Sequence, residues 1–296
     1  MVAKRAVIAG ASGFIGRALV DSLVASGWDV TKLVRRSAGD GEVQWNPGEP
    51  LDPVVVAGAN AVINLAGASI ATMPWSATTK AEILRSRIAT TDTLVEAINA
   101  AKRKPKVFIS GSAIGIYGDR GDEELVETST RGLGFLADVV DQWEARAMRA
   151  TIRTVRIRTG LVLGDGGALK PLRLATSLFA GARVGSGQQW WPWVSLHDEV
   201  RAIRFCIDKP VEGRVNVVGP TPATSETVTR SLARAMGRPH LFVIPRWLIG
   251  ILGEAGHNLL LSSSKVRPEA LEAAGFTFDH PTVNDAIDWV ISGTRP

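Results

Sequence analysis

The chain has 296 residues, of which 45% are hydrophobic and 21% are charged, as is ordinary for a globular protein. This length allows one large domain or two modest ones with a sizeable core. No apolar run approaches the roughly 20 residues that a membrane span needs. The N-terminus leads from MVAKR straight into AVIAGASGF, a strand-like run rather than a signal peptide. We therefore expect a cytoplasmic protein with no membrane partner.

The cysteine, histidine and charge content argues against a disulfide-bonded, a metal-binding and a nucleic-acid-binding protein. The single cysteine, Cys206, rules out an intrachain disulfide and a thiolate metal cluster, and its helical context predicts a buried structural thiol. The four histidines have no metal-ligand spacing, so we expect no metal site. Net charge is +5, but the only dense basic run, KRKPK at 102–106, falls at a predicted helix end, where cations favour the helix dipole. No nucleic-acid partner is predicted.

The first half of the chain alternates strands and helices. Apolar runs predict strands at 5–10, 29–35, 61–67, 106–112 and 152–164, and helical spacing predicts helices at 14–27, 78–102 and 134–150. Strands separated by helices of this length indicate a parallel sheet with helices on both faces. The fold class expected is therefore α/β, a Rossmann-type doubly wound parallel sheet.

The pattern changes from about residue 164. Helices are predicted at 167–181, 196–208, 225–237, 245–260 and 264–275, with one strand at 214–219, and prolines and glycines punctuate them. We therefore divide the chain into a nucleotide-binding domain, 1–163, and a smaller, mostly helical substrate lobe, 164–296. This division allows for segments after residue 163 that pack back onto the first domain.

A glycine motif follows the first strand and opens the first helix. The stretch VIAGASGFIGRALV places Gly10, Gly13 and Gly16 in a G-x-x-G-x-x-G pattern. These glycines permit a tight turn, close approach of a pyrophosphate and close packing of helix on strand. The helix N-terminus then offers N–H donors to phosphates. We expect cofactor contacts from these glycines and from Ser12, Phe14 and Ile15.

The end of the second strand selects the cofactor. A carboxylate there would bind the adenosine ribose of NAD, but this chain has TKLVRRS, with Arg35 and Arg36 at the strand's end. A guanidinium can pair with a 2′-phosphate through charge-assisted hydrogen bonds. We therefore predict NADP(H) rather than NAD(H). The alternative, that both arginines are simply exposed, stays open and is more plausible for Arg36.

Two further strands end in small residues. NLAG ends the third apolar strand, and Leu65, Ala66 and Gly67 fit a backbone that passes close to the cofactor. SGS, residues 110–112, ends the fourth strand. Ligands of open α/β sheets bind at these carboxyl ends, which places Ser112 beside the predicted cofactor.

In this order the features resemble the extended short-chain dehydrogenase/reductase superfamily. The resemblance implies that Ser112 polarises a substrate and that a Tyr-x-x-x-Lys dyad transfers the proton. The dyad is absent, because the only tyrosine is Tyr117 and Gly121 stands four residues later. Taking Glu144 as the acidic residue that follows the dyad, the Tyr and Lys positions hold Leu136 and Val140. The chain is therefore not a standard member.

A closer resemblance accounts for this departure. The stretches ASGFIG, NLAG, RSRIATTDTLVEAI, GSAIGIYG, QWEA, GSGQQWWPWVSLHDEV and PEALEAAGFTF look like the atypical "epimerase family protein" group, an epimerase/dehydratase-like domain with a C-terminal domain of unknown function. The resemblance covers essentially the whole chain and implies NADP(H) binding with no established substrate. It also implies cofactor contacts from Glu82 and Arg87. The alternative for this pair is a helix-surface ion pair or a capping interaction.

Candidate chemistry lies in two stretches. Ser112 and Tyr117 are the catalytic candidates, although we favour Tyr117 as a pocket-lining ring over Tyr117 as a proton donor. The aromatic-amide stretch GSGQQWWPWVSLHDE predicts substrate contacts from Gln189, Trp190, Trp193 and His197. An aromatic seam between the lobes explains the same tryptophans equally well. Asp198 is expected to be a structural anchor.

The sequence thus predicts an NADP(H)-dependent oxidoreductase or epimerase-like enzyme acting on an unidentified small molecule. The alternative is a non-catalytic NADPH-binding sensor or scaffold, which the missing dyad favours. A sugar-nucleotide epimerase that uses NAD is disfavoured by Arg35. A homodimer paired through the long helices that flank the sheet is kept as a hypothesis.

Overall fold

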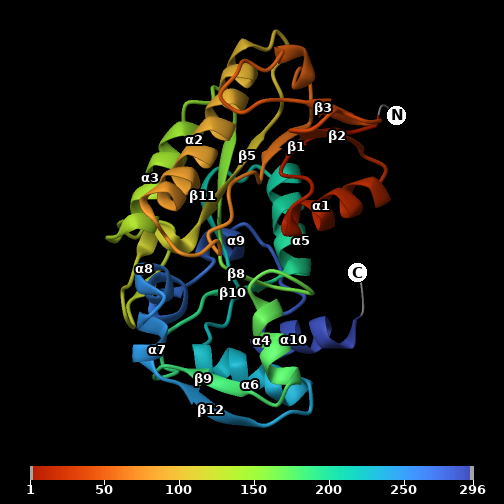
Figure 1. Ribbon diagram of the computed structural model, residues 1–296. Helices are drawn as coiled ribbons and strands as arrows, with labels where there is room; N and C mark the ends of the chain where they lie inside the picture. The colour runs from red at the N-terminus through yellow and green to blue at the C-terminus, as the bar shows by residue number, and fades with distance from the viewer. Residues whose placement is uncertain (1–2, 294–296) are drawn as a thin grey trace.

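Seven parallel strands form one sheet within residues 3–293, the part of the chain that this computed structural model describes (Figure 1). Their run of buried apolar side chains is typical of parallel strands, which are covered on both faces. The order across the sheet is β11 (Gly213–Val217), β7 (Thr154–Thr159), β5 (Phe108–Ala113), β4 (Ala61–Asn64), β1 (Arg5–Ala9), β2 (Asp29–Val34) and β3 (Glu42–Gln44). The doubly wound α/β prediction is confirmed.

Helices cover both faces of this sheet. On one face α1 (Phe14–Ala25) and α5 (Leu196–Asp208) bury Leu19, Leu23 and Ile203 against β1, β5 and β7. On the other face α2 (Ala77–Ala100) and α3 (Phe135–Ala147) lie side by side, as Figure 1 shows. The strands all run in one direction, so their carboxyl ends form a single edge that faces the second lobe.

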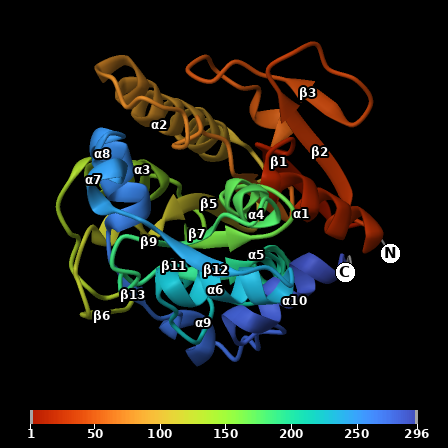
Figure 2. The ribbon, with the colours of Figure 1, turned by 60° about the horizontal axis from the view of Figure 1, so that its bottom comes forward.

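The second lobe has its own small core, which lies at the bottom of Figure 1. Its parallel pair of strands, β9 and β12, is seen from below in Figure 2. Its elements are α4 (Leu169–Ser177), β9 (Gly181–Val184), α6 (Ser225–Ala235), β12 (His240–Ile244), α7 (Arg246–Gly250), α8 (Gly253–Gly256), a π-helical turn (His257–Leu261) and α10 (Val283–Ser292).

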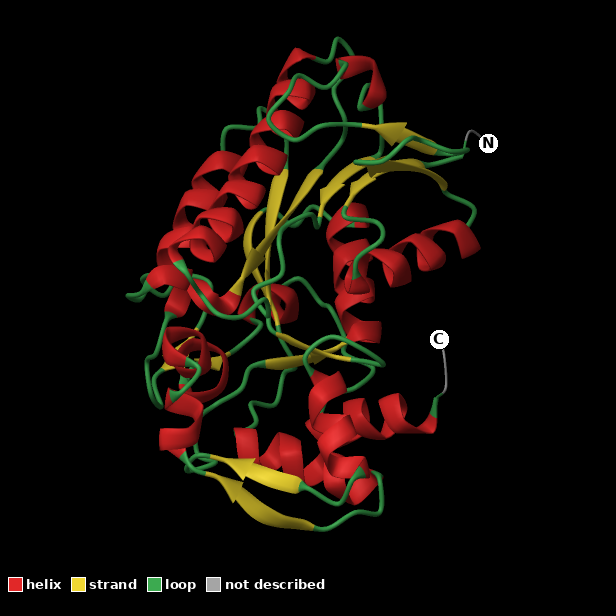
Figure 3. Ribbon diagram, in the orientation of Figure 1, coloured by secondary structure: helices red, strands yellow, loops and turns green. Residues whose placement is uncertain are grey.

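Short elements connect the two lobes. The parallel pairs are β8 (Leu161–Leu163) with β10 (Trp193–Ser195), and β6 (Glu124–Leu125) with β13 (Lys265–Val266). Figure 3 shows these strands as the thin middle layer between the large sheet and the lower lobe. The remaining short helices are α9 (Glu269–Ala273) and the 3₁₀ turns at Pro53–Val55 and Ile114–Tyr117.

The chain crosses between the lobes more than once. After residue 163 it builds α4 and β9, returns to the large sheet as α5 and β11, and then leaves again for α6. The large sheet and its helices therefore include α5 and β11, which follow residue 163, in line with the allowance that later segments return to the first domain. The first-half elements lie close to their predicted ranges, whereas the helix predicted at 245–260 is broken into α7, α8 and the π-helical turn.

Two predictions about single residues are confirmed. Cys206 lies on α5 and is fully buried in the core. Asp198 is 1% exposed and accepts hydrogen bonds from the backbone N–H groups of Asp279 and His280, so it anchors the C-terminal segment. Among the described residues, none of the helices combines the length and apolar character that a membrane crossing requires.

Candidate functional site

The glycine motif forms a cradle in which side chains have no room. Gly10 has φ +81°, and a Cβ added to it would lie 2.5 Å from the backbone carbon of Leu65. A Cβ on Gly16 would lie 2.1 Å from the carbonyl oxygen of Gly10. The loop after β1, the loop after β4 and the first turn of α1 therefore pack backbone against backbone, as a pyrophosphate-binding turn requires.

The N-terminus of α1 is open. Ser12 and Gly13 are exposed, Gly13 is the N-cap without a side-chain cap, and the first turn carries no acidic residue. The uncapped N–H groups of this 12-residue helix are available to an anion, which the helix dipole also favours. Phe14 and Ile15 are half-buried, and the Phe14 ring packs against the turn at Gly164, Gly166 and Gly167.

The two arginines after β2 differ in their partners. Arg36 donates two hydrogen bonds, of 2.7 and 2.8 Å, to the carboxylate of Glu42 on β3. Hydrogen bonds from Arg36 and from the Gly39 backbone lower the pKa of Glu42 to about 2. Arg35 is exposed and makes no ion pair with any described residue. Glu42 thus holds the Arg36 guanidinium while Arg35 has no ion pair among the described residues, and the phosphate contacts of both arginines stay predictions.

The loop after β4 is lined by Arg87 from α2. Its guanidinium donates to the carbonyl oxygens of Ala68 and Ile83, at 3.0 and 2.9 Å, and packs against Gly67 and the Trp143 ring. Burial without a carboxylate partner lowers the pKa of Arg87 to about 10, so it remains a cation at neutral pH. Leu65, Ala66 and Gly67 are partly exposed beside it.

Glu82 lies elsewhere on α2. It accepts hydrogen bonds from Arg85 on the helix surface, one of them of 3.0 Å from Nε. Glu82 thus makes the helix-surface ion pair that was its alternative, with Arg85 as its partner, whereas Arg87 turns inward. Of the two, Arg87 is the residue that borders the cofactor cradle.

Both catalytic candidates, Ser112 and Tyr117, belong to one buried hydrogen-bond network. Ser112 donates to Glu144 at 2.7 Å, and Arg158 donates to the same carboxylate through Nε and Nη2 at 2.7 and 2.9 Å. Arg158 also donates to the Tyr117 hydroxyl at 2.9 Å, which donates in turn to Asn216 at 2.7 Å. These groups link β5, α3, β7 and β11 beneath the sheet edge.

Their burial corrects the expectation that Tyr117 lines a pocket and that Ser112 meets a substrate. Tyr117 is 0% exposed and Ser112 is 5% exposed. Burial raises the pKa of Tyr117 even though Arg158 opposes the rise, so the phenol stays protonated. Burial would also raise the pKa of Glu144, but hydrogen bonds from Arg158 and Ser112 outweigh it and lower that pKa.

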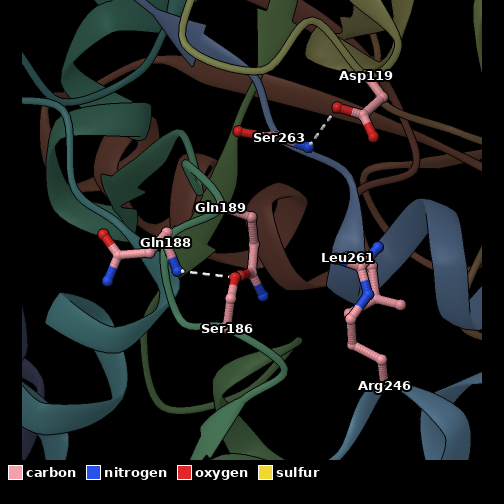
Figure 4. A pocket seen from close by; sticks show the side chains of 7 residues that line it. All are labelled: Asp119, Ser186, Gln188, Gln189, Arg246, Leu261 and Ser263. Atoms are coloured by element: carbon pink, nitrogen blue, oxygen red, sulfur yellow. Dashed lines mark hydrogen bonds between the residues drawn. The ribbon is translucent and has the colours of Figure 1, made fainter.

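A polar pocket of about 260 Å³ lies between the lobes (Figure 4). Its walls come from the loop after the 3₁₀ turn at Ile114–Tyr117, the turn after β9, α7 and the segment before β13. The lining residues are Asp119, Ser186, Gln188, Gln189, Arg246, Leu261 and Ser263. A carboxylate, a guanidinium, amides and hydroxyls face one small space, which suits a polar ligand.

Only one of the four predicted substrate contacts, Gln189, lines this pocket, and its amide donates to the carbonyls of Val184 and Leu260. Trp193 is 1% exposed, with its indole bonded to the Thr221 carbonyl and packed on Gly219. Trp193 was predicted to contact the substrate, but its ring is part of the core of the second lobe and does not line the pocket. The aromatic-seam alternative describes it better.

Trp190 and His197 also lie outside the pocket lining. The Trp190 indole donates to Asp122 at 2.7 Å, and Lys265 lies over its ring, so Trp190 pins the loop at 119–122. His197 lies 2.8 Å from Asp279 and packs near His280 and Trp289. The predicted substrate role of His197 is therefore corrected, because the residue faces the C-terminal segment.

His197, Asp198 and Asp279 offer ligand atoms within 4.8 Å of one another, a grouping that the sequence spacing did not reveal. Both oxygens of Asp198 already accept hydrogen bonds from Arg201, Ser195 and two backbone N–H groups. The geometry is explained by the anchoring of the C-terminal segment, and the expected absence of a metal stays a prediction.

Sequence reasoning missed the pocket residues at 186, 246, 261 and 263. They carry no motif, and they meet only because the turn after β9, α7 and the segment before β13 converge on Asp119. The one local hint was the unbroken polar run GSGQQ, of which Ser186, Gln188 and Gln189 reach the pocket.

Residues 6–219 match the NAD-dependent epimerase/dehydratase family, and residues 244–290 match a domain of unknown function, DUF1731. The chain belongs to the NAD-dependent epimerase/dehydratase family. It is 40% identical to an epimerase family protein of Mycobacterium bovis, covering 98% of this chain and 97% of the relative. It is 35% identical to a chloroplastic epimerase family protein of Arabidopsis thaliana, covering 95% and 84%.

Among solved structures, the human epimerase family protein SDR39U1 with NADPH superposes with a TM-score of 0.89 at 30% identity, covering 98% of this chain and 100% of that chain. A nucleoside-diphosphate sugar epimerase of Corynebacterium glutamicum gives 0.78 at 30% identity, covering 98% of this chain and 58% of that one. A UDP-glucose 4-epimerase of Thermotoga maritima gives 0.76 at 17% identity, which supports the fold alone.

Proposed function

We propose that this protein is an NADP(H)-dependent oxidoreductase or epimerase-like enzyme that acts on a small polar molecule. The observation that carries the proposal is the unpaired Arg35 at the carboxyl end of β2, next to the glycine cradle. The human relative whose structure was solved with NADPH supports the same cofactor. When bound, NADP(H) supplies or accepts a hydride at its nicotinamide ring.

Each part of the cofactor has a matching group in this chain. The open N–H groups at the start of α1 would bind the pyrophosphate, and Arg35 would bind the 2′-phosphate. The backbone at 65–67 would lie along the nucleotide, with the Arg87 cation beside it. The polar pocket between the lobes would hold the reacting molecule.

The first experiment is a paired titration of NADPH and NADH, followed by quenching of tryptophan fluorescence. NADPH should bind at least about tenfold more tightly, a difference of about 1.4 kcal/mol, because only NADPH offers a 2′-phosphate to Arg35. Arg35→Ala should abolish the preference. Arg36→Ala is the matched control and should retain it, since Glu42 already holds that guanidinium. If neither nucleotide binds the wild-type protein, the proposal is wrong.

The burial of Ser112 and Tyr117 favours a second candidate, an NADPH-binding sensor or scaffold that performs no turnover. The two candidates differ in whether bound NADPH is consumed. Incubation with fractionated metabolites should oxidise NADPH if the protein is an enzyme, and Arg35→Ala should slow this oxidation at limiting NADPH. Tight NADPH binding with no oxidation in any fraction would support the sensor.

A further inference from the structure

The pocket between the lobes contains separated opposite charges. Asp119 and Arg246 both line it, yet they form no ion pair with each other. Among the described residues, the basic side chain that pairs with the Asp119 carboxylate is His257, whose Nε2 lies 3.9 Å from it. Figure 4 shows Asp119 with Ser263 on one side, and the Arg246 side chain extending from α7 toward Leu261. A ligand between them can therefore meet an acceptor at one end and a cation at the other.

Arg246 has no polar partner within residues 3–293. Its guanidinium makes no ion pair and no hydrogen bond with the described residues, while its aliphatic stem packs on Gly185, where an added Cβ would lie 3.3 Å from Cγ. Arg246 as a whole is exposed, so its head group is accessible to a ligand. A guanidinium without a carboxylate partner is suited to a carboxylate or phosphate.

A second arginine lies beside the same turn. Arg183 on β9 packs its stem on Gly187, and its Nε is buried without a hydrogen-bond partner. A buried donor without an acceptor is costly, so this group makes the surroundings of the turn at 185–188 favourable for a negative charge. Arg183 also interacts electrostatically with Glu226 beside the same turn, so Arg246 is the guanidinium there without a carboxylate among the described residues.

The opposite wall accepts hydroxyl groups. The Ser263 backbone N–H donates to one oxygen of Asp119 at 3.2 Å, which fixes the carboxylate. The other oxygen has the distant His257 ring as its neighbour and is available to a ligand hydroxyl. The pocket volume of about 260 Å³ is below the ~300–1,000 Å³ typical of sites that enclose drug-sized ligands. A pocket of this size encloses a small ligand rather than a whole nucleoside diphosphate sugar.

We infer that this pocket binds a small hydroxyl-bearing organic anion, with its carboxylate or phosphate on Arg246 and a hydroxyl on Asp119. This inference rests on the proposed function, since it names the substrate class of the same site. It assigns Arg246 as the residue that selects anionic substrates over neutral polyols.

The test uses the full chain and three matched probes measured by calorimetry, with and without saturating NADP⁺. The probes are glucitol, which is neutral, gluconate, which carries a carboxylate, and glucitol 6-phosphate. At least one anion should bind ten or more times tighter than glucitol, and which anion does so identifies the preferred group. Arg246→Gln should remove that tenfold difference. Arg238→Gln is the control, because its guanidinium lies over the Phe179 ring and does not line the pocket.

The outcomes separate this inference from the proposed function. Arg246→Gln should bind NADPH as the wild-type protein does, since Arg246 is not part of the cofactor cradle. The inference is overturned if all three probes bind equally, if neither anion binds, or if the Arg246→Gln protein keeps the preference for the anion. UDP-glucose that binds more tightly than both anions would also overturn it. If the wild-type protein does not bind NADPH, the proposed function is refuted instead.

Discussion

Arg158 on β7 is a buried cation beside Tyr117, in a chain whose dyad positions hold Leu136 and Val140. It is 3% exposed, pairs with Glu144 and donates to the Tyr117 hydroxyl. A buried ion pair of this kind tolerates the loss of neither partner, because the remaining charge is left without compensation. The network therefore fixes Tyr117 as a structural group and keeps its phenol away from a ligand.

Tyr117→Phe should lower the free energy of unfolding by roughly 1–3 kcal/mol, because Arg158 Nη1 and Asn216 Oδ1 each lose a buried partner. Urea denaturation measures the change, and NADPH affinity should stay at the wild-type value. Ser112→Ala is the milder comparison, since Glu144 keeps its hydrogen bonds from Arg158. A Tyr117→Phe protein with wild-type stability and lost turnover would instead identify Tyr117 as a proton donor.

Helix α5 carries a carboxyl group that the fold buries completely. Glu199 is 0% exposed, accepts one hydrogen bond from Thr159 at 2.8 Å, and has no partner for Oε2. Burial outweighs the hydrogen bond from Thr159 and raises the pKa of Glu199 to about 8. The side chain is therefore protonated in the folded protein at neutral pH, when the same group in the unfolded chain is ionised.

Because Glu199 is protonated in the folded state and ionised in the unfolded state, the stability of the protein depends on pH. Between the usual glutamate pKa and about 8 the folded state holds a proton that the unfolded state has released, so the free energy of unfolding falls as pH rises through that window. Glu199→Gln should remove this slope and make the protein more stable than wild type at pH 9, by at least about 1 kcal/mol.

Chemical denaturation at several pH values between 5 and 9, a range of roughly four units that spans the shifted pKa, measures this slope. The exposed Glu212 supplies the control, and Glu212→Gln should keep the wild-type slope. A Glu199→Gln protein whose stability changes with pH as the wild type does would contradict the assignment.

Some helices and strands could be predicted from the sequence and others could not, for physical reasons. α1, α2, α3 and β1 have long periodic runs, so local pattern and packing agree, and they were predicted within a few residues. The strands β6, β9, β10, β12 and β13 have two to five residues each and no alternation to detect. α10 was missed although it begins with a capping box, Thr282 with Asp285, which is a readable signal.

At the scale of the whole molecule, the two lobes are held together by polar contacts that cross between them. Asp198 on α5 accepts from the backbone of Asp279 and His280 and pairs with Arg201, and Ser264 donates to the Gly118 carbonyl. Since α5 packs on the large sheet and residues 279–280 lead into α10, Asp198 couples the two cores.

Asp198→Asn should therefore destabilise both lobes in one cooperative transition, by about 3 kcal/mol, because the amide turns a donor toward a backbone N–H and removes the buried carboxylate from Arg201, which keeps only its pair with Asp279. Differential scanning calorimetry should show a single peak at a lower temperature. Asp208→Asn removes only the exposed pair with Lys4 and should cost less than about 1 kcal/mol. Two separate peaks would mean that the lobes unfold independently.

The sequence by itself determined the α/β class, the glycine cradle, the arginines after β2 and the absence of a Tyr–Lys dyad. These are local properties, since a strand, a tight turn and the first turn of a helix are adjacent in the chain. Only the tertiary structure decided that Glu42 holds Arg36 and leaves Arg35 free, that Tyr117 is buried beside Arg158, and that Arg246 and Asp119 line one pocket. Each of these depends on which distant strands and helices meet, and burial and pairing follow from that meeting rather than from neighbours in sequence.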